Sequence, residues 1–303
     1  MNDFIKQQIS QIAGDSNVRF NEDMSKHTTF RVGGAAEVFA EPDSAETLSR
    51  LVWYLNNVQQ DYFILGNGSN LLVSDKGYSG TVICMGSRFS SVEISGNTIK
   101  AGAGAMLSGV ARMAGEASLS GMEFASGIPG SAGGAVVMNA GAYGGDISQI
   151  LKEAEAVAAN GNMITLTNGE LKFGYRDSIC RREKLTVISA TFELADGNRD
   201  MIEARMNELA QQRRMKQPLE YPSAGSTFKR PEGYFAGKLI MDAGLSGMTI
   251  GGAKVSEKHC GFIINTGKAT AADIYDCINE VRDKVKQRFN VELEPEVCML
   301  GEF

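Results

Sequence analysis

The sequence predicts an α+β protein with three consecutive regions. In some segments apolar residues recur at helical spacing, in others short β-branched runs are bounded by turn residues, and the glycines gather in a few clusters. These observations together favour helices and strands joined by tight turns. The 303 residues suffice for two or three domains with cores of their own. We expect the regions at residues 1–86, 87–214 and 215–303.

The first region is expected to alternate helices with strands. Isoleucines recur at helical spacing from Ile5 to Ile12, which predicts a short amphipathic helix. Asp43–Glu46 has the residue types of a capping box, so a second helix should begin there. Tyr62–Leu65 and Thr81–Met85 are apolar runs that favour buried strands. The region is therefore predicted to be βαβ-like.

The second and third regions each combine strands with helices. In the second region we expect strands at Val92–Ile94, Thr98–Ala101, Ala154–Ala158, Met163–Leu166 and Leu185–Leu194, and helices at Met106–Ala114 and from Ile202 to about Met215. Asn160–Gly161 should form a hairpin turn. In the third region we expect a helix at Tyr234–Ala243, a strand at Gly261–Ile264, a helix from a capping box at Thr270–Asp273 to Val285, and a strand at Val291–Met299.

Charge and composition exclude several classes of protein. The formal net charge is −6, and basic residues cluster only in doublets such as Arg181–Arg182 and Arg213–Arg214, which argues against nucleic-acid binding. Five cysteines without a CxxC pair and only two histidines argue against a metal site, so reduced thiols are expected. No apolar run has transmembrane length and no signal peptide is recognisable, so we expect a cytoplasmic protein that does not bind membranes.

A glycine-rich loop follows the expected strand at Tyr62–Leu65. Its sequence is GNGSNL, residues Gly66–Leu71. The glycines let the backbone turn sharply and expose its N–H groups, while Ser69 and Asn70 add side-chain donors. Such a loop can bind a pyrophosphate. A plain turn is the alternative for this loop taken alone.

A second glycine-rich stretch spans Gly127–Gly145. It includes SGIPGSAGG at Ser126–Gly134 and NAGAYGG at Asn139–Gly145. Glycines lose much backbone freedom on folding, so this many predict a close approach of the backbone to a flat, extended ligand. Contacts between helices through small residues are the alternative. Neither stretch has the spacing of a Rossmann dinucleotide site.

Two motifs with charged residues are weak when taken alone. Gly174–Ser178 contains a Tyr-Arg-Asp triplet, which an exposed or ion-paired arginine would explain equally well. Leu293–Val297 contains two glutamates around a proline and can equally be a solvated acidic pair.

A third weak motif surrounds Ser226. The small residues within Tyr221–Lys229 would leave the Ser226 hydroxyl open to a ligand, although a turn or N-cap serine is the alternative. No Gly-x-Ser-x-Gly motif occurs here, and His27 and His259 are the only histidines, which disfavours a hydrolase triad.

In their order along the chain, these five motifs resemble one family of bacterial flavoenzymes. The resemblance extends from HTTFRVGG at His27–Gly34 to EPEV at Glu294–Val297, nearly the whole chain. The chain is similar to the UDP-N-acetylenolpyruvoylglucosamine reductase (MurB) family of peptidoglycan precursor synthesis. The resemblance implies an FAD-binding fold of the vanillyl-alcohol-oxidase/PCMH type, with subdomains at 1–86 and 87–214, and a C-terminal α+β substrate-binding domain at 215–303.

The resemblance also implies non-covalently bound FAD and no metal. In the first loop the implied FAD-binding residues are Gly66, Asn67, Gly68, Ser69, Asn70 and Leu71. In the second stretch they are Ser126, Gly127, Ile128, Pro129, Gly130, Ser131, Gly133, Gly134, Asn139, Ala140, Gly141, Ala142, Asp146 and Ile147.

The reaction implied by the resemblance is the NADPH-dependent reduction of UDP-N-acetylglucosamine enolpyruvate to UDP-N-acetylmuramate. Reduced FAD gives hydride to the enolpyruvyl group, and a proton must then reach the adjacent carbon. The family's proton donor falls on Ser226, and its two stabilising residues fall on Arg176 and Glu296. An arginine can hold a carboxylate bidentately, a serine is a useful acid only in a dry site, and Glu296 would need a raised pKa.

Further substrate contacts are implied by the same resemblance. The implied substrate-binding residues are Tyr143, Arg176, Ser226, Lys229, Lys238, His259 and Glu296. Arg230 stands where some relatives have asparagine, and His259 can equally be a surface histidine. Only 49 residues lie between Arg176 and Ser226, so the chain resembles the shorter subclass without the insert whose tyrosine covers the substrate. A monomer is expected.

Two other functions are weighed against this one. Another FAD oxidoreductase, such as an alcohol oxidase, often attaches flavin through histidine or cysteine. Here His27 is the only N-terminal histidine and no cysteine lies in the glycine loops, which favours non-covalent FAD. A non-catalytic flavin- or nucleotide-binding module would not need a proton donor, so the joint presence of Arg176, Ser226 and Glu296 argues against it.

Overall fold

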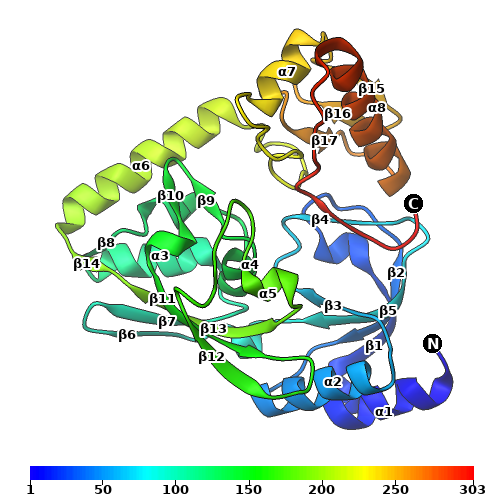
Figure 1. Ribbon diagram of the computed structural model, residues 1–303, viewed down its shortest axis with the longest axis vertical. Coiled ribbons are helices and arrows are strands. Elements are labelled where there is room, and N and C mark those ends of the chain that lie inside the picture. Colours follow the sequence, from blue (N-terminus) through cyan, green and yellow to red (C-terminus); the bar gives the residue numbers. More distant parts are fainter. The chain divides into compact units, whose positions relative to one another are not determined.

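The structure is a computed structural model that describes residues 1–303 (Figure 1). The chain divides into two compact units, each assembled from separate stretches of sequence. Unit 1 comprises Met1–Phe20, Val38–Asn67 and Gly80–Gln212, and unit 2 comprises Asn21–Glu37, Gly68–Ser79 and Arg213–Phe303. The first glycine-rich loop therefore passes from unit 1 to unit 2 between Asn67 and Gly68.

A four-stranded sheet and two helices form the N-terminal part of the fold. The strand order is β1–β2–β5–β3, with β1 at Val18–Asp23, β2 at Ala35–Ala40, β3 at Tyr62–Leu65 and β5 at Tyr78–Cys84. β3 and β5 pair in parallel. The helices are α1 (Asp3–Ala13) and α2 (Ala45–Asn57), which bury Ile9 and the leucines of α2 in the core of unit 1.

The larger sheet of unit 1 is antiparallel. Its strand order is β12–β11–β13–β7–β6, with β6 at Val92–Ser95, β7 at Thr98–Gly102, β11 at Leu151–Val157, β12 at Met163–Thr167 and β13 at Thr186–Glu193. The predicted turn at Asn160–Gly161 joins β11 to β12, and Gly161 has a φ of 81°. α4 (Ala132–Val137) packs on β13 and β7 (Figure 1).

Short elements complete unit 1. They are β8 (Leu119–Ser120), β9 (Gly141–Ala142), β10 (Gly145–Asp146), β14 (Ala195–Asp196), α3 (Leu107–Glu116) and α5 (Ile179–Arg182). The long helix α6 (Arg199–Lys216) runs from unit 1 into the sequence of unit 2.

Unit 2 has a small sheet covered by one long helix. The elements are β4 (Leu71–Val73), α7 (Ala236–Asp242), β15 (Thr249–Ile250), β16 (Ala253–Val255), β17 (Ile263–Asn265), α8 (Ala271–Phe289) and β18 (Cys298–Leu300). α8 packs on the sheet β15–β16–β17, and β18 pairs in parallel with β4. The predicted capping box of Thr270 and Asp273 begins α8. The Asp75 carboxylate also accepts from the N–H groups of Ala271 and Ala272, at 2.9 and 2.8 Å.

Several predicted boundaries are wrong. α2 has Ser44 as its N-cap, bonded to the Thr47 N–H, rather than a box between Asp43 and Glu46. The closing strand covers only Cys298–Leu300, because the residues before it form single bridges and hydrogen bonds instead of a ladder. α7 starts two residues after Tyr234. The α+β class is confirmed by the mixed helix and strand content.

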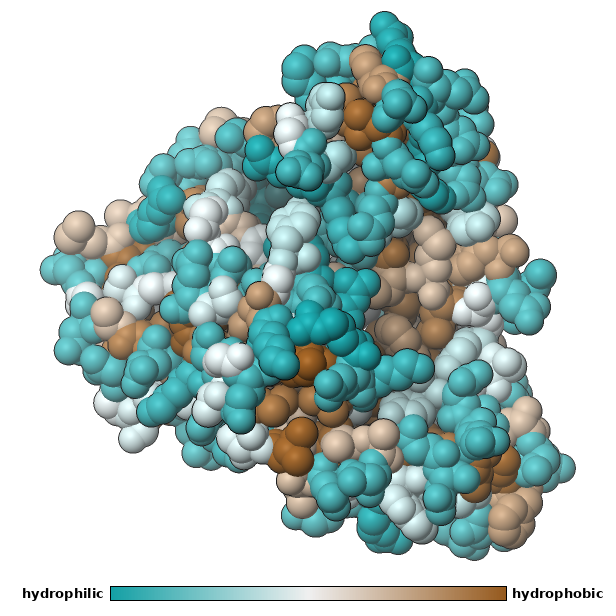
Figure 2. Space-filling view, in the orientation of Figure 1, coloured by the Kyte–Doolittle hydropathy of each residue, from teal (hydrophilic) through white to brown (hydrophobic).

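On the face drawn in Figure 2, hydrophilic residues cover most of the surface and hydrophobic ones lie among them in small groups. No helix combines the length and the apolar character that a membrane span needs. The cysteines are all free thiols, and burial raises the pKa of Cys84 to about 12 and that of Cys180 to about 11. These thiols are therefore protonated and poorly reactive.

Candidate active site

The first glycine-rich loop begins where β3 ends and is held by close backbone packing. In unit 1, a side chain on Gly66 would collide with the Ser131 hydroxyl. In unit 2, Gly68 has a φ of 59° and lies against the carbonyl of His27, so a Cβ has no room there. The fold itself therefore requires both glycines of this loop.

The same loop presents a row of unused backbone donors. The N–H groups of Asn67–Asn70 make no hydrogen bond within the protein. Such groups need water or a ligand as acceptor, and successive N–H groups in a turn form an anion-binding concavity. The Asn67 side chain donates to the Pro129 carbonyl, which joins this loop to the second glycine stretch within unit 1. The arrangement fits a phosphate-bearing cofactor.

The second glycine stretch is packed mainly against other parts of unit 1. A Cβ on Gly133 would lie 2.7 Å from Ala103, and one on Gly145 would lie 2.6 Å from the ring of Phe124. Packing within the protein, rather than approach to a ligand, therefore accounts for these two glycines. Gly144 differs, because it has a φ of 88° and no atom within 4 Å of the Cβ position.

α4 starts inside this stretch, and the donors of its first turn are already used. Ser131 is the N-cap, and its hydroxyl accepts from the Gly134 N–H at 3.3 Å. The N–H groups of Ala132 and Gly133 donate to backbone carbonyls of Ala103–Ala105. The stretch can therefore offer a ligand few donors from the helix itself.

Three predicted site residues of unit 1 share a left-handed backbone. Asn139, Tyr143 and Arg176 have φ values of 41°, 54° and 56°. The Arg176 guanidinium donates to the carbonyl of Gly141 at 3.0 Å and to that of Asn139 at 3.4 Å. The Asn139 amide donates to the Gly174 carbonyl at 3.0 Å. Such backbone costs free energy in non-glycine residues and is typical of functional sites.

The environment of Arg176 separates it from its acidic neighbour. Asp177 pairs with Arg182, while the half-buried Arg176 lies 5.1 Å from the centroid of the Tyr175 ring. The two charged residues of the Tyr175–Asp177 triplet thus make different contacts, Arg176 with the Tyr175 ring and Asp177 with Arg182. Arg176 is oriented by the carbonyl groups of Asn139 and Gly141.

In unit 2 the structure brings Ser226 and Glu296 onto neighbouring segments. The Glu296 N–H donates to the Thr227 carbonyl at 2.8 Å. Thr227 is itself fixed, because its N–H donates to the Gly261 carbonyl at 2.8 Å and its hydroxyl accepts from the Ile263 N–H at 3.0 Å. Thr227 is buried, whereas Ser226 is exposed. The two predicted catalytic residues of unit 2 therefore lie on adjacent segments, with Ser226 exposed.

The predicted substrate-binding lysines have acidic partners. Lys229 forms an ion pair with Glu294, and its side chain is 20% exposed. Lys238 pairs with Asp242, one turn later in α7, at 2.8 Å. An anionic ligand would have to share each ammonium group with a carboxylate. The Lys238–Asp242 pair lies at the surface, where such a contact contributes little stability and exchanges readily.

His259 is half-buried. Its Nδ1 accepts from the Gly261 N–H at 3.1 Å, and its ring meets that of Phe262 edge-on at 5.0 Å between centroids. Burial lowers the pKa of His259. The neutral imidazole can offer a ligand a donor at Nε2 rather than a positive charge.

Arg230 is stacked on an aromatic ring. Its guanidinium lies 4.0 Å from the centroid of the Phe235 ring, and its Nε donates to the Tyr234 carbonyl at 3.3 Å. These contacts orient the Arg230 side chain.

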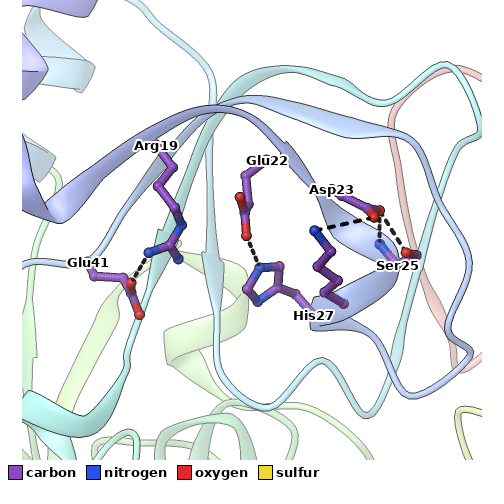
Figure 3. Close-up of polar contacts among 7 residues, drawn as sticks. Arg19, Glu22, Asp23, Ser25, His27 and Glu41 are labelled. Carbon is purple, nitrogen blue, oxygen red and sulfur yellow. Dashed lines mark hydrogen bonds and ion pairs between the residues drawn. The ribbon is translucent and has the colours of Figure 1, made fainter.

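One polar pair behind the first loop is not predicted from the sequence. The Nε2 of His27 lies 2.8 Å from a carboxylate oxygen of Glu22, and their side chains are 22% and 20% exposed (Figure 3). Next to them, Asp23 accepts from the N–H and hydroxyl of Ser25. The carbonyl of His27 is the group that lies against Gly68. The HTTFRVGG motif marks this segment, but its sequence does not show the pairing with Glu22.

Two family models match the chain. One describes the C-terminal domain of UDP-N-acetylenolpyruvoylglucosamine reductase and covers residues 217–300. The other describes an FAD binding domain and covers residues 36–167. The UDP-N-acetylenolpyruvoylglucosamine reductase of Agathobacter rectalis is 53% identical over 295 residues, which are 93% of this chain and 94% of the relative. The chain belongs to this family.

Other members support the same assignment over the full length. The UDP-N-acetylenolpyruvoylglucosamine reductase of Caldanaerobacter subterraneus subsp. tengcongensis is 49% identical over 302 residues, 100% of both chains. The crystal structure of the Thermus caldophilus reductase superposes with a TM-score of 0.80 and 34% identity, over 94% of this chain and 98% of that one.

A more distant structure bears on the fold alone. A variant of Phl p 4, a glucose oxidase, matches with a TM-score of 0.50 and 12% identity, over 65% of this chain and 45% of that one. With the two family models, it confirms the predicted FAD-binding fold and the additional C-terminal domain. Family membership confirms an FAD-dependent oxidoreductase. The contacts of single residues with FAD or substrate stay predictions, as do the domain boundaries.

Proposed function

We propose that this chain reduces UDP-N-acetylglucosamine enolpyruvate to UDP-N-acetylmuramate with electrons from NADPH, as a cytoplasmic monomer. The family supports the reductase activity, and the FAD-binding model supports the flavin. The observation that carries the catalytic assignment is the 2.8 Å hydrogen bond from the Glu296 N–H to the Thr227 carbonyl, next to Ser226. Residues 1–86 and 87–214 would bind FAD, and 215–303 the substrate.

The residues of the two glycine-rich stretches fit FAD. Bound FAD would supply hydride transfer from NADPH to the terminal carbon of the enolpyruvyl group. The unused N–H groups of Asn67–Asn70 would hold its diphosphate, because they lack acceptors in the protein. Glycines of the second stretch, Ser126–Ile147, would allow the close packing within the protein that gives this stretch its shape.

Arg176 would bind the substrate carboxylate. Charge builds up on that carboxylate and on the adjacent carbon once the terminal carbon has received hydride. A guanidinium held in advance by the carbonyls of Asn139 and Gly141 needs little reorganisation to stabilise this charge. Its planar group can also meet a carboxylate through two parallel hydrogen bonds.

Ser226 would deliver the proton to the adjacent carbon. A hydroxyl is a weak acid in water, so it acts only against a strongly basic carbon in a site closed to solvent. Glu296, held next to it through Thr227, would form a hydrogen bond to the charged intermediate. Tyr143, Lys229, Lys238 and His259 would contact other parts of the UDP-sugar.

The proposal is tested by observing the two half-reactions separately. The purified protein should be yellow and release its flavin on denaturation. NADPH should reduce the flavin, and in stopped-flow experiments without oxygen the UDP-sugar should reoxidise it. A folded protein that takes up no FAD would contradict the proposal. Reduction of the flavin by simple alcohols, without reoxidation by the UDP-sugar, would favour the alcohol-oxidase alternative.

A further inference from the structure

Asn70 connects the first glycine loop to the segment that carries Glu296. Its side-chain amide donates to the Glu296 carbonyl at 3.0 Å, although the two residues are 226 positions apart. The backbone carbonyl of Asn70 accepts from the Cys298 N–H at 3.0 Å. All three residues lie in unit 2. Asn70 therefore holds the chain on both sides of Val297, directly before β18 pairs with β4.

The peptide groups of Glu296 are held from two directions. Its N–H donates to the Thr227 carbonyl, beside Ser226, and its carbonyl accepts from Asn70. Both backbone polar groups of Glu296 are thus committed, one to the segment of the proton donor and one to the FAD loop.

We propose that Asn70 is a positioning residue that acts through Glu296, rather than a side chain that binds FAD. Its backbone N–H remains available to the cofactor, while its amide group fixes the peptide that carries the carboxylate. The inference rests on the proposed role of Glu296. Because small misplacements of a group that stabilises charge slow a reaction strongly, loss of this one bond should slow the substrate half-reaction about tenfold.

The test compares three properties of the variant Asn70→Ala with those of the wild type. We expect the FAD dissociation constant to change less than about threefold, and NADPH to reduce the flavin at the wild-type rate. Reoxidation by the UDP-sugar should be about tenfold slower. In the FAD-free protein, amide hydrogen exchange at Glu296 should become faster, because the hydrogen bond that its carbonyl accepts from Asn70 is lost and its backbone is less firmly held. Asn70→Asp keeps the shape of the side chain but lacks the N–H donor to the Glu296 carbonyl, and it provides a second variant.

A matched control separates this role from general stability. Ser74 follows β4 directly, and its hydroxyl donates to the Glu302 carbonyl. Ser74→Ala therefore removes another side-chain bond between the same two segments without touching Glu296. We expect it to lower the thermal midpoint and to leave both half-reactions at wild-type rates. A slowing of reoxidation equal to that of Asn70→Ala would overturn the inference.

A double-mutant cycle tests whether Asn70 acts through Glu296. In the background of Glu296→Gln, Asn70→Ala should slow reoxidation less than about twofold further, since the group that it positions is already lost. Full additivity, or a rise in the FAD dissociation constant without slower reoxidation, would contradict the inference. If Glu296→Gln itself reoxidises normally, the proposed role of Glu296 fails. If Glu296→Gln is slow and Asn70→Ala is normal, only the inference about Asn70 fails.

Discussion

The two units hold their predicted site residues by different means. In unit 1, Asn139, Tyr143 and Arg176 have left-handed backbone, and glycines such as Gly145 are packed against neighbours without spare room. In unit 2, neither Ser226 nor Glu296 has a positive φ, and hydrogen bonds between segments distant in sequence hold them. Near these residues, unit 1 should therefore be sensitive to added volume, because Gly145 has no room for a side chain. Gly225, beside Ser226 in unit 2, has no atom within 4 Å of its Cβ position, so the loss of a polar group should matter more there.

The largest effect is expected from Ser226→Ala in unit 2. The variant keeps the backbone bonds of Thr227 but lacks the hydroxyl, so it should reoxidise with the UDP-sugar about a thousandfold more slowly. NADPH should still reduce its flavin at the wild-type rate, as measured by stopped-flow absorbance. Near-normal turnover would remove Ser226 from the mechanism.

Added volume should damage unit 1 more than added strain alone. Gly145→Val would drive a side chain into the Phe124 ring, and we expect it to lower the free energy of unfolding by about 3 kcal/mol. Gly144→Ala, one residue earlier, meets only the strain of a positive φ and should cost about 1 kcal/mol. Urea unfolding of both variants measures the difference. Equal losses would show that packing does not dominate here.

The sequence predicts the regular elements better than the reasons for the glycines. Tyr62–Leu65 and the capping box of α8 agree with the structure, because apolar periodicity and capping are local signals. The number of glycines predicts a close approach to a ligand, but Gly133 and Gly145 face protein atoms that the sequence does not place. The contact of Asn70 with Glu296 joins residues 226 positions apart, so no local pattern reveals it.

A smaller effect is expected at the polar contacts of α8 in unit 2. Asp75 accepts from the first N–H groups of this helix, so Asp75→Ala should lower the free energy of unfolding by about 1–2 kcal/mol. Asp283→Ala changes an exposed acid in the interior of α8 and provides the control. If both variants unfold at the same urea concentration, the contact of Asp75 with α8 contributes nothing to the free energy of unfolding.

The smallest effect is expected from the protonation of His259. Burial lowers the folded-state pKa of His259 below its ordinary value of about 6.5, so the unfolded chain binds the proton more readily. By linkage, stability should fall as the pH decreases through 6.5 and stop falling below the folded-state pKa. Thermal midpoints of the wild type and of His259→Gln, measured between about pH 5 and 8, where histidine titrates, test this prediction. A parallel pH dependence of the two proteins would exclude His259 as the source.

The separation of Asn70 from Glu296 also affects how the protein can be made. During synthesis the chain is built from its N-terminus, so β4 and the second half of the first glycine-rich loop leave the ribosome long before β18 and Glu296, which lies 226 positions after Asn70. Closing so large a loop is slow, since its entropy is lost before its contacts form. Unit 2 can therefore be completed only after β18 has left the ribosome, and until then the loop residues Gly68–Asn70 lack the strand that anchors them.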